Sequence, residues 1–131
     1  MKKEIKFRGK RIDDGEWAYG SYHYSKCNEH HYILNLEKFI DVDDRMKSLH
    51  KIEVVDVDPK TVGQYIGNKD CDGGEIYDGD VLCVPHLEGK KHQVRLVIEW
   101  DDERAKYTDY SPRGVFKILG NIYDNPELIN N

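Results

Sequence analysis

Three carboxylates lie close together in the middle of the chain, at Glu75, Asp78 and Asp80. Neighbouring carboxyl groups can act as general acid and general base when their environments separate their pKa values. The same residue types also occupy turns, because short acidic side chains accept hydrogen bonds from nearby backbone amides. The chain has no nucleophile-elbow motif and no glycine-rich phosphate loop. The pattern therefore favours turns over a catalytic pair, and a hydrolytic enzyme ranks third among the functions that the sequence suggests.

Cysteine and histidine residues offer a second chemistry, metal binding. Cys27, His30 and His31 have a spacing that zinc sites use, and Cys71 or His23 could complete a tetrahedral set. A structural zinc site usually has two close ligand pairs, however, and the second pair is missing here. The sequence therefore predicts free thiols, no metal and no cofactor.

The amino-terminal segment is basic, with six Lys or Arg residues among the first eleven. On a strand, Lys6, Arg8 and Lys10 would share one face while Ile5 and Phe7 face the core. Such a stripe could contact nucleic-acid phosphates, or its lysines could protect an exposed sheet edge from aggregation. Because the net charge is −5, nucleic acid is a less favoured partner than protein.

Tyrosine is unusually frequent, with nine tyrosines against three phenylalanines. Tyrosine suits half-buried strands and is also enriched at protein interfaces. Tyr107 and Tyr110 flank a polar loop at residues 101–112, and we take them as candidate partner-binding residues. The expected partner is an unidentified protein or a second copy of this chain.

Short alternating segments predict a mainly β protein. The expected strands are residues 5–8, 17–24, 32–36, 52–57, 61–66, 81–84, 94–100 and 115–119, whereas residues 37–51 fit a short helix or a long loop. Pro59 cannot donate to a ladder and marks a junction between an amino-terminal β lobe (1–58) and a second lobe (59–131). Asn125 and Pro126 fit the start of a short helix, as N-cap and first residue.

The second lobe carries two motifs, at residues 64–81 and 120–128, whose glycines and acidic residues suit tight turns. We refer to them as the first and second motifs. Their defining residues are Gln64, Gly67, Asp70, Gly73, Glu75, Ile76, Tyr77, Gly79, Asp80, Gly120, Asn121, Tyr123, Pro126 and Glu127.

These motifs together resemble the YopX family of phage and prophage proteins, over most of the chain apart from about residues 24–56. The resemblance implies a mainly β fold with an SH3-like barrel in the carboxy-terminal part, and it carries over no catalytic motif. Residues expected to face inward in that barrel are Val81, Val84, Val94, Leu96, Ile98, Phe116 and Ile118. The predicted function is a small phage or prophage accessory protein that acts by binding or self-assembly.

Composition fits one small domain of 131 residues, with 38% hydrophobic and 34% charged residues. Three cysteines, an odd number with wide spacing, argue against a disulfide framework. No secretory leader and no membrane-spanning segment is evident, so the expected location is the bacterial cytoplasm and no membrane partner is expected.

Overall fold

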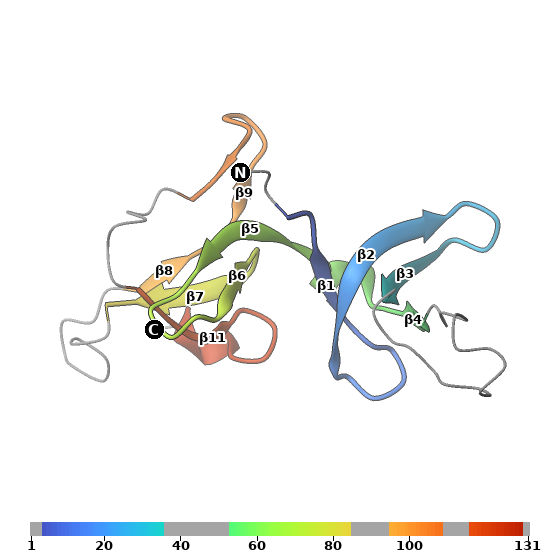
Figure 1. Cartoon of the computed structure of the whole chain (residues 1–131), viewed down its shortest axis with the longest axis horizontal. Coiled ribbons are helices and arrows are strands. Elements are labelled where there is room, and N and C mark those ends of the chain that lie inside the picture. Colours follow the sequence, from blue (N-terminus) through green and yellow to red (C-terminus); the bar gives the residue numbers. More distant parts are fainter. Residues whose placement is uncertain (1–3, 36–52, 85–94, 109–115, 130–131) are drawn as a thin grey trace, which may run out of the picture. The chain divides into compact units, whose positions relative to one another are not determined.

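A computed structural model describes residues 4–35, 53–84, 95–108 and 116–129 (Figure 1). The chain divides into two compact units, one formed by Ile5–Gly63 and the other by Gln64–Asn131 together with Met1–Glu4. The predicted segment at residues 37–51 lies outside the described residues. In the described ranges, no helix is long and apolar enough to cross a membrane.

The amino-terminal unit contains four antiparallel strands in the spatial order β4-β3-β2-β1 (Figure 1). They are β1 (Phe7–Lys10), β2 (Trp17–Ser25), β3 (His30–Asn35) and β4 (Glu53–Asp56), followed by a 3-10 turn, η2 (Pro59–Thr61). Pairing aligns Tyr22 with Ile33 and Ile33 with Val55. Because successive side chains alternate between faces, this register places the apolar residues of three strands on one side.

The core of this unit is built on that side of the sheet. Ile33, Val55 and Val57 are buried, and four partly buried residues pack against them, namely Phe7, Ala18, Tyr22 and Val62. Gly20 is needed inside β2, because a Cβ at this position would collide with the carbonyl oxygen of Leu34 in β3. At this position the backbone of β2 thus approaches the backbone of β3 closely.

The carboxy-terminal unit consists of small antiparallel sheets. A hairpin pairs β5 (Gly63–Lys69) with β6 (Glu75–Tyr77), a second pairs β9 (Trp100–Asp101) with β10 (Lys106–Tyr107), and a three-stranded sheet has the order β11-β7-β8. Its strands are β7 (Asp80–Cys83), β8 (Arg95–Val97) and β11 (Lys117–Asn121), and a 3-10 turn, η4 (Pro126–Leu128), follows. The mainly β prediction is confirmed. The described strands of this unit form open sheets and do not close into a barrel, so the SH3-like barrel is not confirmed.

Strand β7 runs through the middle of the three-stranded sheet and is buried along its whole length. Leu82, Ile76 and Ile98 form the core, and Ile66, Leu96, Tyr107, Phe116 and Ile118 pack against it. The inward orientation predicted for Val81, Leu96, Ile98, Phe116 and Ile118 is therefore confirmed. Val84 is partly buried, and Val94 lies outside the described residues.

The predicted continuous strand at residues 94–100 was wrong. Strand β8 ends at Val97, and Ile98 instead pairs with the turn before β7. Its carbonyl oxygen accepts from Gly79 N at 2.8 Å, and its amide donates to the carbonyl oxygen of Asp80 at 2.9 Å. Trp100 then opens a separate hairpin and is 47% exposed. These two bonds depart from the regular ladder in which Val81 pairs with Val97, and local alternation does not reveal such an irregularity.

The predicted helix start at Asn125 is only partly realised. Pro126 does occupy the first turn of η4, but the side chain of Asn125 makes no capping hydrogen bond. Its Oδ1 instead accepts from the backbone amide of Asn121 at 3.2 Å. The residue therefore closes the loop after β11, and η4 lasts for three residues.

Candidate functional site

The two motifs meet at Gly79. Its amide donates to Ile98, and its carbonyl oxygen accepts from Ile122 N at 2.9 Å, one residue before Tyr123. Gly79 has φ +97°, and a Cβ there would lie 3.0 Å from Cε2 of Tyr123. Glycine is thus required both by the backbone conformation and by the aromatic ring that the second motif places over it.

Buried polar side chains hold this junction together. Asp80 is 2% exposed, and its Oδ2 accepts from Tyr77 N at 2.8 Å. Asn121 is 8% exposed, and its Oδ1 accepts from the backbone amides of Tyr123 and Asp124 at 3.0 and 2.9 Å. Because the side chains of Asp80 and Asn121 accept hydrogen bonds from backbone amides, both stabilise the local fold. Position 120 requires glycine because a Cβ there would collide with Oδ1 of Asn125.

Glu75 and Asp78 of the first motif also make local contacts. Glu75 Oε1 accepts from the Tyr77 hydroxyl at 3.2 Å. Asp78 donates its amide to the carbonyl oxygen of Gln64 at 3.0 Å. The carboxylate of Asp80 is directed at a backbone amide, which is a turn contact.

Asp70 organises the turn between β5 and β6. Its Oδ1 accepts from Asp72 N at 3.0 Å and from Gly74 N at 2.7 Å, while Oδ2 accepts from Ile118 N at 3.1 Å. Gly73 has φ +87° at the tip of the turn. One carboxylate therefore closes its own turn and ties it to β11.

The β9–β10 hairpin borders a solvent-open hollow of about 520 Å³, lined by residues 99–104 and 106–108. Its aromatic wall is formed by Trp100 and Tyr107, which are paired across the two strands. Their ring centroids lie 5.1 Å apart at an interplanar angle of 73°, an edge-to-face contact. Such contacts orient aromatic rings, so the half-exposed indole of Trp100 has a defined position.

Hydrogen bonds around the hairpin hold Trp100 and Tyr107 in position. Thr108 Oγ1 accepts from Glu99 N at 2.9 Å, and the Tyr107 hydroxyl donates to Gln64 Oε1 at 3.5 Å. Partial burial, with a smaller effect of the nearby Asp78 carboxylate, raises the pKa of Tyr107, so its phenol stays neutral. Asp101 Oδ1 accepts from the amides of Glu103 and Arg104 and thereby closes the turn.

Apart from Trp100, this hairpin lies inside the segment, residues 101–112, that the sequence predicted to be a polar loop. Tyr107 does line the hollow, while Tyr110 lies outside the described residues. Sequence reasoning missed Trp100, which was placed in a continuous strand. The useful signal was the acidic run Asp101–Glu103 directly after it, because such a run is typical of an exposed turn rather than of a buried strand.

A family model described as "YopX protein" matches residues 6–130, which is nearly the whole chain. The chain belongs to the YopX family. This confirms the resemblance inferred from the two motifs, whose residues converge at Gly79.

A solved structure similar to this YopX-family chain is that of protein EF1440 from Enterococcus faecalis. The TM-score is 0.61 at 20% sequence identity, and the match covers 98% of this chain and 99% of that one. At this identity the likeness concerns the fold alone. No curated protein matches the chain.

The basic stripe predicted on β1 has a different arrangement in the structure. Ile5 is 71% exposed, whereas Arg8 is only 6% exposed. The guanidinium of Arg8 lies 4.5 Å from the ring centroid of Trp17, and Nζ of Lys10 lies 5.6 Å from it. The expectation that Ile5 faces the core and Arg8 the solvent was wrong, because Trp17 on β2 covers the basic face. Lys6 is partly buried.

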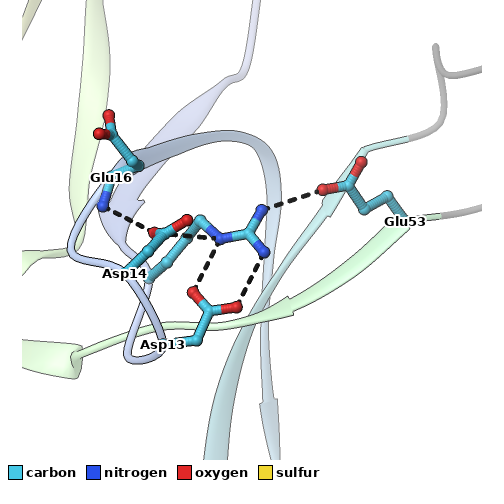
Figure 2. Close-up of polar contacts among 5 residues, drawn as sticks. Asp13, Asp14, Glu16 and Glu53 are labelled. Atoms are coloured by element: carbon cyan, nitrogen blue, oxygen red, sulfur yellow. Dashed lines mark hydrogen bonds and ion pairs between the residues drawn. The ribbon is translucent and has the colours of Figure 1, made fainter.

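Arg11 is surrounded by carboxylates (Figure 2). Its Nε and Nη2 donate to the two oxygens of Asp13 at 3.0 and 2.9 Å, and Nη1 lies 3.3 Å from Oε1 of Glu53. Asp14 Oδ1 lies 3.4 Å from Nε of Arg11 and accepts from Glu16 N. The contact between Arg11 and Glu53 links the β1–β2 turn to β4, and the three carboxylates compensate the positive charge of Arg11.

We expect Asp13 to titrate at abnormally low pH. The hydrogen bond from Arg11 lowers the pKa of Asp13 to about 2, from 3.8. A depressed folded-state pKa stabilises the fold above the unfolded value, so this contribution is complete above pH 3.8 and is lost as pH falls through about 2. Carboxyl NMR titration should show the low pKa, and Arg11→Gln should return it toward 3.8. A normal value in the unsubstituted protein would contradict the ion pair.

The candidate metal ligands are each occupied by other contacts or lie apart. His30 Nδ1 lies 2.7 Å from Asp56 Oδ2, and Nδ1 of His31 contacts the Tyr22 hydroxyl. Cys27 is exposed. Over the described ranges, no three His, Cys, Asp or Glu side chains are grouped as metal ligands, and Cys71 and Cys83 are also free thiols.

Proposed function

We propose that this YopX-family chain is a small accessory protein encoded by a phage or prophage, and that it acts in the bacterial cytoplasm by binding another protein. The hollow at the β9–β10 hairpin is the observation that carries the binding role. A half-exposed tryptophan beside a hollow of about 520 Å³ has the chemistry of an interface anchor.

The local structure supports this assignment. Strong interface residues are usually large aromatic side chains whose position is fixed before binding. Trp100 meets this condition, since Tyr107 packs against it and the tyrosine is itself hydrogen-bonded to Gln64. The indole can therefore be buried by a partner with little loss of conformational freedom.

Capture of partners from cells that carry the encoding element tests the proposal. We expect a protein to be retained by the unsubstituted chain and lost from Trp100→Ala. Tyr19→Ala is the matched control, because Tyr19 is 44% exposed and belongs to the other unit. Sedimentation of the purified chain tests whether the partner is a second copy. Equal retention by both variants would place the binding surface elsewhere.

The two alternatives have weaker support. A phosphate-binding stripe would need Arg8 at the surface, whereas this side chain is buried against Trp17. A hydrolytic site built on the acidic turns would need available carboxylates, whereas Asp80 accepts a backbone hydrogen bond in the core.

A further inference from the structure

We infer that the hollow at the β9–β10 hairpin receives an arginine side chain of the partner, held between the indole of Trp100 and the carboxylates of the hairpin. The inference rests on the proposed binding function and adds the chemical class of the group that is bound. Three features carry it: the hollow, its aromatic wall and its charge.

The hollow and its wall define what can enter. Its volume of about 520 Å³ leaves room for a long side chain, and it is open to solvent. The exposed indole offers a π-face, on which a flat cation binds favourably. This chain already contains such a contact, since the guanidinium of Arg8 lies 4.5 Å from the ring centroid of Trp17.

The charge of the lining selects a cation. Asp101 is engaged by two turn amides and lies 3.8 Å from Nε of Arg104, so its charge is already compensated. Glu99, Asp102 and Glu103 also line the hollow and are exposed. The lining thus holds four acidic residues against two basic ones, Arg104 and Lys106, and a positively charged occupant would offset the remaining negative charge.

Arginine fits this combination better than lysine. Its planar guanidinium can stack on an indole while its edge donates two parallel hydrogen bonds to one carboxylate. An ammonium group lacks the flat face and is more strongly hydrated. The predicted binding order is therefore arginine above lysine, with a neutral isostere far below both.

Indole NMR signals provide a direct test, because the chain has two tryptophans. The probe is the peptide N-acetyl-Gly-Arg-Gly-amide, and the control replaces arginine by the neutral isostere citrulline. We expect the Trp100 indole signal to move saturably with the arginine peptide in the millimolar range and not with citrulline. Trp17 should stay unchanged, since Arg8 and Lys10 already lie over its ring.

Carboxylate variants test the electrostatic part. Glu99→Gln combined with Glu103→Gln should weaken binding of the arginine peptide by about fivefold or more, and added salt should weaken it further. Glu16→Gln is the control, because it removes one exposed acidic charge in the other unit. Equal binding of the arginine and citrulline peptides would overturn the inference, as would an unchanged affinity in the double variant.

The outcomes separate this inference from the proposed function. If Trp100→Ala loses a captured protein but the arginine peptide does not bind, the binding role holds and the arginine assignment is wrong. If the arginine peptide binds at Trp100 but the same protein is captured by all variants, the site chemistry holds and the captured protein binds at another surface.

Discussion

Gly79→Ala should lower the free energy of unfolding by about 3 kcal/mol. A non-glycine residue at φ +97° costs about 1–3 kcal/mol in backbone strain, and overpacking adds a similar amount. The overpacking arises because the new Cβ would lie 3.0 Å from Cε2 of Tyr123, which must move. Chemical denaturation followed by tryptophan fluorescence measures the loss.

Gly15→Ala is the matched control for this effect. Gly15 also has a positive φ, +74°, but nothing lies within 4 Å of a Cβ built there. Only strain should remain, about 1 kcal/mol. If the two variants lose the same stability, the contact between the motifs contributes nothing, and Gly79 serves only the turn.

Asp70→Ala should destabilise the carboxy-terminal unit by about 3 kcal/mol, because hydrogen bonds to a charged acceptor are worth more than neutral ones and their loss leaves donors unpaired. The carboxylate accepts from three backbone amides, those of Asp72, Gly74 and Ile118. The amide of Ile118 matters most, since it belongs to β11 and is far from Asp70 in the sequence. The same denaturation measurement applies, and amide hydrogen exchange at Ile118 should accelerate.

Asp72→Ala provides the control, since it removes an exposed carboxylate two residues away and leaves all three hydrogen bonds in place. We expect a change below about 0.5 kcal/mol. An equal loss in both variants would mean that the charge of the turn matters and the Asp70 hydrogen bonds do not.

Much of the strand pattern could be predicted, because its causes are local. The alternation that turns successive side chains of β2 and β3 to opposite faces is a property of any extended chain. The turn at Gly73 follows from residue types that accept positive φ. Family membership was also accessible, since the two motifs are short and contiguous in the sequence.

The candidate site could be predicted only in part. Tyr107 was identified from its place beside a polar loop, but Trp100 was assigned to a strand interior, because alternation alone does not show where a strand ends. The strand ends at Val97, and Ile98 bonds to the turn at Gly79 and Asp80. That partner is about 20 residues away, beyond the range of local propensity.

The sequence by itself determined the β class, most of the strands and the two motifs, since each depends on side-chain alternation and turn chemistry within a few residues. Tertiary structure decided which face of β1 is covered, that the carboxy-terminal sheets stay open, and that Trp100 stands exposed beside a hollow. These outcomes depend on contacts between distant segments. Trp17 buries Arg8, and Tyr123 requires a glycine at Gly79, because the fold brings these pairs together in space.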